Sequence, residues 1–375
     1  MANTFQLLAG ADAFLRELGA ALDGCQRSLY AQFMTYEGDA VGQAFSDRLA
    51  ARAAAGADVR LMVDGYTDVV LNDIYPILLH RLGEAREERA RTQALFESLR
   101  ARGVAIQRTA PPGPLGVYLP YRNHKKMVVI DERVAFVGGI NISEHNFAWH
   151  DFMVRIEGPL VADLAEDFRS TWDGATTPFD TPRPGEDFIL NQCAGRYPIF
   201  EEVLAMIGRA EQSIVIESPY LLGDYIERAL LAAARRGVRV TIILPHASNK
   251  LMYRLWSRKL RRRLAHPNAA LYGFRGNGGM THAKLLLVDD RWATFGSFNM
   301  IELEGITQKE LNVFTGDVDL IEQLQQFVAR DLAQSTPLAP ARITGGRFTY
   351  YLLHRVFRWW TRRLLRRPDW KGIYC

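Results

Sequence analysis

Short apolar runs alternate with longer stretches of helical spacing through most of the chain. The runs hold four to eight residues, are rich in β-branched side chains and are bounded by turn residues, a pattern that predicts strands. One run precedes a helical stretch, a second run follows it, and two further runs separated by an acidic turn come next. This pattern occurs twice along the chain. The predicted strands cover residues 26–33, 56–63, 127–130, 134–137, 212–218, 237–244, 285–288 and 292–295.

This order predicts an α/β fold built from two halves. Each half contains a strand, a helix, a second strand and then a hairpin. A mostly parallel sheet with helices on its faces is the usual solution for such an alternation. We therefore expect each half to be a β-sheet flanked by helices.

The two predicted hairpins carry the same polar residues. Residues 124–141 and 282–299 align at a constant offset of 158 and are identical at seven positions, which are His, Lys, Asp, Arg, Ala, Gly and Asn. Seven identities in the same order indicate an internal repeat. The repeated polar residues are His124, Lys126, Asp131 and Asn141 in the first copy and His282, Lys284, Asp289 and Asn299 in the second.

The chemistry of the repeated residues favours an anionic phosphodiester substrate. Residues two apart on a strand point to the same side, so each His is expected beside its Lys. One imidazole can attack phosphorus while the other protonates the leaving oxygen, and ammonium and amide donors stabilise the charge on the phosphoryl oxygens. Asp131 and Asp289 lie in the predicted turns, where organising the hairpin is a more natural role than carrying a proton.

Both windows resemble the phospholipase D superfamily, whose members carry the HxKxxxxD signature followed by GGxN or GSxN. The resemblance extends from residue 7 to about residue 335, where the spacing is similar to that of bacterial cardiolipin synthases of the soluble type. It implies one active site on a pseudo-twofold axis between the halves, and a ping-pong reaction through a phosphohistidine that needs no metal and no cofactor.

The resemblance also implies roles for individual residues. His124 is the expected nucleophile and His282 the expected general acid and then base. Phosphate binding is expected from Lys126, Lys284, Asn141 and Asn299, and the motif aspartates Asp131 and Asp289 belong to the same catalytic signature. Members also use an acidic residue after each motif to orient an imidazole, and Asp151 and Glu310 stand 27 and 28 residues beyond the two histidines.

Composition fits two core-forming halves. The chain has 375 residues, 48% of them hydrophobic and 23% charged, which is ordinary for a globular protein of two or three domains. Residues 176–186 are rich in Pro and polar residues, so we place the boundary there, with one half at residues 1–178 and the other at residues 187–340. The first half is longer between its second strand and its motif, and residues 73–102 are expected to be helical.

Several classes of protein are disfavoured. His, Cys, Asp and Glu show no metal-ligand spacing, which argues against a metal hydrolase. Cys25, Cys193 and Cys375 are too scattered for a disulfide framework, which indicates a reducing compartment. No apolar stretch approaches the ~20 residues that span a bilayer, and the N-terminus lacks the pattern of a signal peptide.

The positive charge of the chain is concentrated at its C-terminal end. Residues 341–375 carry nine Lys or Arg and one Asp, a net charge of +8, although the whole chain has a net charge of only +4. If this segment is helical, Leu353, Phe357, Trp360 and Leu364 lie on one face and arginines on the other. Such a helix can lie among lipid headgroups, so residues 341–375 are expected to associate with a membrane.

These features favour a peripheral phosphatidyltransferase. The expected donor is phosphatidylglycerol, the partners are anionic phospholipids and a membrane surface rather than nucleic acid, and the expected location is the cytoplasmic face of the bacterial inner membrane. A phospholipase D-type hydrolase, or a nuclease with its basic segment on nucleic acid, would use the same residues with water as acceptor. A non-catalytic scaffold protein would be expected to have lost motif residues, but both copies are complete.

Overall fold

A computed structural model describes residues 2–70, 81–110, 121–174, 187–193, 196–249, 251–302 and 307–340. The predicted boundary at residues 176–186 and the predicted membrane segment at residues 341–375 lie outside the described residues. The predictions for these two segments therefore remain predictions.

The first half forms a seven-stranded sheet with the strand order β1-β8-β7-β6-β2-β3-β4. Strands β2, β3 and β4 are parallel, whereas β6, β7, β8 and β1 continue the sheet with antiparallel pairing. The elements of this half are β1 (Thr4–Ala9), α1 (Gly10–Asp23), β2 (Ser28–Phe33), α2 (Ala40–Ala54), β3 (Asp58–Asp64), η1 (Gly65–Asp68), α3 (Arg81–Ala101), β4 (Ala105–Thr109), β5 (Arg122–Asn123), β6 (Met127–Ile130), β7 (Val134–Gly138), α4 (Glu144–Phe147), β8 (Phe152–Glu157) and α5 (Leu160–Trp172).

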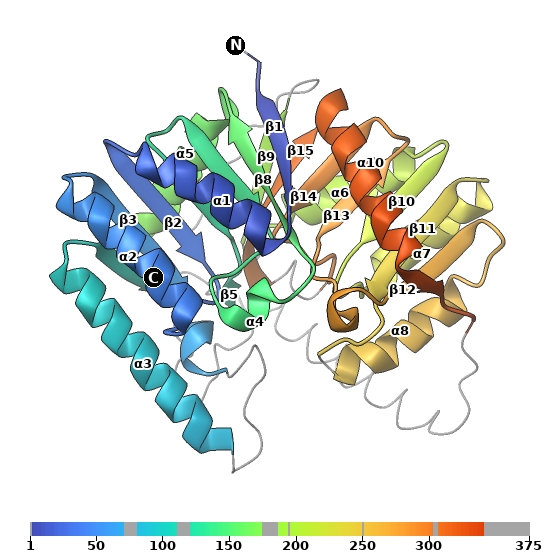
Figure 1. The fold of residues 1–375 in the computed structure, drawn as a ribbon. Helices are drawn as coiled ribbons and strands as arrows, with labels where there is room; N and C mark the ends of the chain where they lie inside the picture. The colour runs from blue at the N-terminus through green and yellow to red at the C-terminus, as the bar shows by residue number, and fades with distance from the viewer. Residues whose placement is uncertain are drawn as a thin grey trace.

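The second half repeats this plan in a second sheet (Figure 1). Strands β10, β11 and β12 are parallel, and β13, β14, β15 and β9 follow with antiparallel pairing. Its elements are β9 (Phe188–Gln192), α6 (Pro198–Arg209), β10 (Ser213–Glu217), α7 (Asp224–Arg235), β11 (Arg239–Pro245), α8 (Leu251–Arg263), β12 (Ala269–Phe274), η3 (Asn277–Gly279), β13 (Leu285–Val288), β14 (Trp292–Gly296), β15 (Gln308–Thr315), α10 (Val318–Ala333) and β16 (Ser335–Pro337).

The predicted α/β class and the order of elements in each half are confirmed. Capping side chains fix the starts of two helices, and glycines follow the ends of two. The Asp39 side chain accepts a hydrogen bond from the Gly42 backbone at the start of α2, and Asp317 does the same for Leu320 at the start of α10. Gly56 and Gly237 follow α2 and α7 with positive φ angles of 95° and 100°, a conformation that favours glycine after a helix.

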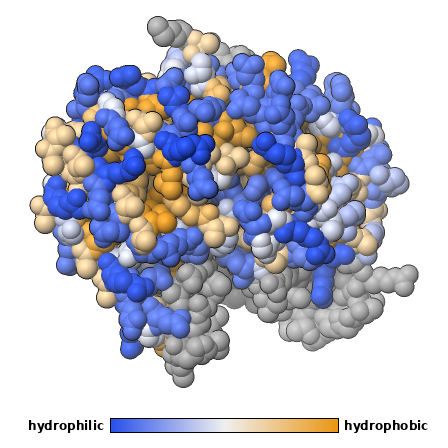
Figure 2. All heavy atoms as spheres, in the orientation of Figure 1, coloured by the Kyte–Doolittle hydropathy of each residue, from blue (hydrophilic) through white to orange (hydrophobic). Residues whose placement is uncertain are grey.

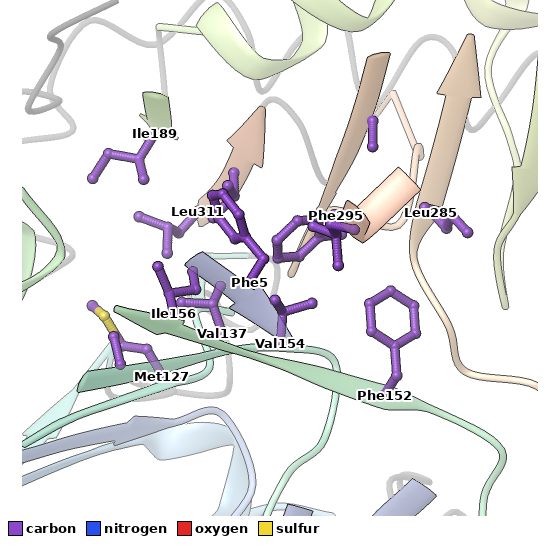
Figure 3. Close-up of a cluster of buried hydrophobic side chains, with 14 of the residues drawn as sticks. Phe5, Met127, Val137, Phe152, Val154, Ile156, Ile189, Leu285, Phe295 and Leu311 are labelled. Atoms are coloured by element: carbon purple, nitrogen blue, oxygen red, sulfur yellow. The ribbon is translucent and has the colours of Figure 1, made fainter. Parts of the chain in front are cut away.

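A shared apolar core lies between the two sheets. Residues alternate along the motif strands, so Met127 and Val129 face this central core while Val128 and Ile130 face the helices of the first half. Leu285 and Leu287 face the same central core from the second sheet. Figure 3 shows side chains of both sheets pointing toward one another in this cluster.

The remaining helices cover the outer faces of the sheets. Helices α1, α2 and α3 pack on the first sheet, and α6, α7 and α8 pack on the second, each set over its own apolar cluster. Helices α5 and α10 instead contribute to the central core. Polar and charged residues cover most of the surface in the view of Figure 2, with smaller apolar areas between them.

The short strand β5 connects the halves. It belongs to the first half by sequence but pairs in parallel with β15 of the second sheet. Because β5 is followed at once by His124, this pairing brings the first motif to the edge of the second half.

Candidate active site

The motif histidines lie directly before two central strands. His124 precedes β6 and His282 precedes β13, and each of these strands is hydrogen-bonded on both sides within its sheet. The Asp131–Glu132 and Asp289–Asp290 turns have positive φ angles of 53° to 55°, as tight hairpin turns require. Both motifs are therefore presented by rigid elements at equivalent places in the two halves.

The halves exchange backbone hydrogen bonds at the two histidines. The backbone N–H of His124 donates to the Lys309 carbonyl at 2.8 Å, and that of His282 donates to the His150 carbonyl at 2.6 Å. Lys309 and His150 are the residues immediately before Glu310 and Asp151. Each histidine is thus bonded through its backbone to the residue that precedes the acid of the opposite half.

Each imidazole is bonded to a carboxylate of the other half. Nδ1 of His124 lies 3.0 Å from the carboxylate of Glu310, and Nδ1 of His282 lies 2.7 Å from Oδ2 of Asp151. Both carboxylates are at most 1% exposed. A carboxylate at Nδ1 fixes the ring orientation and keeps the proton on Nδ1, so that Nε2 is the nitrogen that can react. Asp151 and Glu310 were expected to orient imidazoles, but the sequence alone did not reveal that they act across the interface.

Burial and the motif lysines set the charge of these acids. Burial raises the pKa of Asp151 to about 6, although Lys284 and Lys126 oppose that rise. Burial likewise raises the pKa of Glu310 to about 7 against the opposing effect of Lys126, Ser297 and Lys284. Since both lysines act on both acids, the two motifs form one electrostatic unit.

The lysines and asparagines of the motifs are buried beside the histidines. Nζ of Lys126 donates to the His124 carbonyl at 2.6 Å, and Nζ of Lys284 donates to the His282 carbonyl at the same distance. Asn141 accepts a hydrogen bond from the Thr35 backbone at 3.1 Å, which holds its amide in place. Asn299 is 2% exposed. The structure therefore places cationic and amide groups from both halves close to the imidazoles.

The residue after the motif glycine differs between the halves for a physical reason. A Cβ atom at Gly139 would lie 2.3 Å from Oδ2 of Asp151, so any larger residue would displace that carboxylate. The equivalent Ser297 instead donates its hydroxyl to Oε2 of Glu310 at 2.5 Å. Both solutions fix the position of an acid that bonds a motif histidine.

The motif aspartates do not meet the histidines. The Asp131 carboxylate accepts hydrogen bonds from the backbone N–H groups of Gln26, Arg27 and Ser28. The Asp289 carboxylate accepts from residues 211, 212 and 213 in the same way. Partial burial alone would raise the pKa of Asp131, but the backbone donors outweigh it and lower the pKa. The two aspartates thus hold the chain entering β2 and β10, and this contact lies outside the hairpin that they were expected to organise.

An aromatic wall that the sequence did not single out flanks His282. The ring centroids of Trp149 and His282 are 5.0 Å apart, and Tyr220 lies 6.4 Å from His282 and stacks on Tyr253 at 4.3 Å. These residues belong to a small apolar cluster with Leu222, Met280 and Ile301. The surroundings of His282 therefore combine an acid, a lysine and an apolar surface.

Residues that could ligate a metal meet behind His282. One ligand atom from each of His150, Glu217 and Asp331 lies within 4.8 Å of the others. No sequence spacing predicted this group, because its members come from three distant segments. His150 and Asp331 already bond to each other at 2.8 Å, and Thr281 donates to Glu217.

None of the described helices is long and apolar enough to cross a membrane.

Comparison with known proteins identifies the family. The family model described as "Cardiolipin synthase, PLD-like domain" matches residues 18–172 and 203–332. The chain is 29% identical over 361 residues to cardiolipin synthase B of Salmonella typhimurium, a match that covers 88% of this chain and 82% of that protein. It is 25% identical over 360 residues to the probable cardiolipin synthase YwiE of Bacillus subtilis, with 90% and 68% covered.

Solved structures show the same fold. Phosphatidylserine synthase of Haemophilus influenzae superposes with a TM-score of 0.71 at 14% identity and covers 96% of this chain and 94% of its own. Polyphosphate kinase of Porphyromonas gingivalis gives a TM-score of 0.62 at 12% identity, with 96% and 53% covered. The family match spans both motif-bearing halves, and the chain belongs to the cardiolipin synthase family with a phospholipase D-like domain.

Proposed function

We propose that the protein is a phosphatidyltransferase that moves a phosphatidyl group from phosphatidylglycerol to the hydroxyl of an acceptor lipid. With phosphatidylglycerol as the acceptor, the products are cardiolipin and glycerol. The observation that carries this proposal is the pair of imidazoles, each bonded through Nδ1 to a carboxylate of the opposite half. Two equivalent imidazoles in one site suit a reaction with two successive displacements at phosphorus.

In the first displacement, Nε2 of His124 attacks phosphorus and the bond from phosphorus to the glycerol oxygen breaks. His282 gives its Nε2 proton to that oxygen, so glycerol leaves as a neutral alcohol. The phosphatidyl group is then held on His124 as a phosphohistidine. The Asp151 carboxylate stabilises the charge of His282 before the proton is transferred.

In the second displacement, His282 takes the proton of the acceptor hydroxyl and the acceptor oxygen attacks phosphorus. The bond between phosphorus and His124 breaks, and Glu310 keeps the released imidazole in its original orientation. The phosphoryl oxygens carry negative charge throughout, and the cationic and amide groups that stabilise it are Lys126, Lys284, Asn141 and Asn299. These donors perform the charge stabilisation that metal ions perform in other phosphodiesterases.

We also propose that the protein works at the cytoplasmic face of the bacterial inner membrane. The substrates proposed here are membrane phospholipids, and the charge of +8 in residues 341–375 would attract anionic headgroups. Although that segment lies outside the described residues, its composition supports a peripheral contact with the membrane.

Purified protein incubated with phosphatidylglycerol vesicles tests the proposal. Mass spectrometry of the lipids should show cardiolipin, and glycerol should be released in equal amount. The matched control is His124→Ala, which should form neither product. Phosphatidic acid as the sole lipid product would show that water is the acceptor and that the protein is a hydrolase.

A further inference from the structure

A polar cluster of one partly exposed and two buried side chains lies next to the backbone of His282. It joins Glu217 at the end of β10, Asp331 on α10 and His150 just before β8. Nε2 of His150 lies 2.8 Å from Oδ2 of Asp331. The imidazole is stacked between two phenyl rings, with centroid distances of 4.6 Å to Phe274 and 4.9 Å to Phe327. The cluster is thus held by both hydrogen bonds and aromatic packing.

Ionising both carboxyl groups of the cluster is unfavourable, because they are buried and close together. Glu217 is 0% exposed and Asp331 is 1% exposed. Burial raises the pKa of Glu217 well above its usual value, and the neighbouring charge of Asp331 raises it further, with a smaller effect in the same direction from Asp151. Burial and the nearby charge of Asp331 thus both act against the ionised form of Glu217.

The Glu217 side chain bonds to Thr281 and lies close to Asp331. Oε1 of Glu217 accepts the hydroxyl of Thr281 at 2.5 Å. No donor among the described residues bonds to Oε2, although this atom is buried. Asp331 is the side chain beside this carboxyl group, since one polar atom from each of Glu217, Asp331 and His150 lies within 4.8 Å of the others. The resulting chain runs from Glu217 to Asp331 and from Asp331 to His150.

His150 connects this chain to the catalytic imidazole in two ways. Its backbone carbonyl accepts the backbone N–H of His282 at 2.6 Å, while its own N–H donates to the Met280 carbonyl at 3.2 Å. The next residue is Asp151, whose carboxylate binds Nδ1 of His282 at 2.7 Å. A shift of His150 would therefore move two hydrogen-bond partners of His282 at once.

The first half has a different arrangement at the equivalent place. Gln32 occupies on β2 the position that Glu217 occupies on β10, and Asn123 precedes His124 as Thr281 precedes His282. Nε2 of Gln32 donates to Oδ1 of Asn123 at 2.7 Å. An uncharged amide pair thus stands behind His124, whereas a pair of acids with an imidazole stands behind His282. The supports of the two histidines differ although their motifs repeat.

We propose that His150, Asp331 and Glu217 form a positioning chain that holds Asp151 and the backbone of His282 in register for proton transfer. This inference rests on the proposed function, because it assumes that His282 is the general acid and base. The three residues do not touch substrate in this scheme. A metal ion held by the same three side chains would be a different arrangement, and the experiment below separates the two.

The first test is His150→Phe, assayed on a soluble short-chain phosphodiester. Phenylalanine keeps the stack on Phe274 and Phe327 but removes the bond to Asp331. We expect kcat to fall at least tenfold while KM stays within about twofold, because the chain positions a catalytic group rather than the substrate. A folded His150→Phe protein with the kcat of the wild type would overturn the proposal. His282→Ala, measured alongside, tests the proposed function separately, since activity in that variant would refute the role of His282 itself.

The second test replaces Glu217 and does not depend on how well the first variant folds. Glu217→Gln keeps a polar group that can donate a hydrogen bond toward Asp331, whereas Glu217→Leu removes it. Most of the activity lost in Glu217→Leu should be recovered in Glu217→Gln. Equal losses in both variants would contradict a polar link between residue 217 and Asp331. One equivalent of tightly bound divalent metal in the purified wild type, absent from Glu217→Gln, would also overturn the proposal.

Discussion

Replacing Asp151 by asparagine is expected to stop turnover while leaving the fold intact. The amide has nearly the shape of the carboxylate, so the packing against Gly139 is preserved. What changes is the partner of His282, whose Nδ1 lies 2.7 Å from Oδ2 of Asp151. The amide has no negative charge and can present an N–H group where the carboxylate presented an acceptor.

The size of the loss follows from this geometry. A hydrogen bond to a charged group contributes about 1.5–3 kcal/mol, which corresponds to a roughly 10- to 150-fold change in rate at about 1.4 kcal/mol for each factor of ten. An amide N–H facing Nδ1 would also favour the wrong tautomer of His282. The same exchange of carboxylate for amide costs about 10⁴-fold in the Ser-His-Asp triad. We therefore expect kcat of Asp151→Asn to fall by about 10²- to 10⁴-fold.

Steady-state kinetics on a soluble short-chain phosphodiester measure this effect without a contribution from membrane binding. Both kcat and kcat/KM should fall by the same factor, because Asp151 acts through His282 and not on the bound substrate. The matched control is Asp290→Asn, an exposed aspartate in a hairpin turn where φ is 54°. Asparagine tolerates that conformation well, so the control should retain wild-type activity and stability.

A modest effect would refute the reasoning. If folded Asp151→Asn kept kcat within threefold of the wild type, the bond across the two halves would not orient a catalytic imidazole. A large rise in KM with kcat unchanged would instead place Asp151 in substrate binding.

Further predictions concern pH, the motif aspartates, the C-terminal segment and metal. Activity should fall as pH decreases through 7 and then 6, because Glu310 and Asp151, with pKa values of about 7 and about 6, must be ionised to bond Nδ1–H, and a pH–rate profile measures this. Because the pKa of Glu310 is raised, its contribution to stability is full below about pH 4.5 and is lost as pH rises through about 7. The unfolding free energy of Glu310→Gln should therefore fall less between pH 5 and pH 8 than that of the wild type, by up to about 3 kcal/mol in urea titrations. An equal fall in both proteins would contradict the buried charge. Asp289→Ala should lower the unfolding free energy by about 2 kcal/mol but change kcat less than tenfold, since its carboxylate binds backbone N–H groups away from His282. Deleting residues 346–375 should weaken co-sedimentation with anionic vesicles most strongly at low salt and preserve activity on a soluble substrate; equal sedimentation of both proteins would place the membrane contact elsewhere. EDTA should leave activity unchanged, and a loss restored by a divalent ion would refute the metal-free mechanism.

The sequence predicts the repeated architecture well because the repeat is local. Each motif strand is a short apolar run beside a turn, and the alternation of Val128 and Val129 between two cores follows from the strand period alone. The expected α/β class and the family resemblance were both confirmed.

What the sequence could not supply is the pairing of distant side chains. Spacings of 27 and 28 residues after the histidines mark Asp151 and Glu310 as candidates. Only the contacts between the halves show that each acid serves the opposite half, through the pairing of β5 with β15 for Glu310 and the bridge of His150 with Thr281 for Asp151. The cluster of His150, Glu217 and Asp331 is similar, because its members are far apart in sequence and meet through packing of α10 on the central core. His150 alone gave no signal that distinguished it from an ordinary structural histidine.

Capture of the covalent intermediate tests the central claim most directly. His282→Ala protein is incubated with a short-chain phosphodiester whose leaving group is acidic enough to need no protonation, then quenched under conditions that preserve phosphohistidine and digested for mass spectrometry. The proposed mechanism predicts that the phosphoryl adduct accumulates on His124, because the base that activates the acceptor is missing. An adduct on any other residue, or its absence from His124 in both this variant and the wild type during turnover, would contradict it.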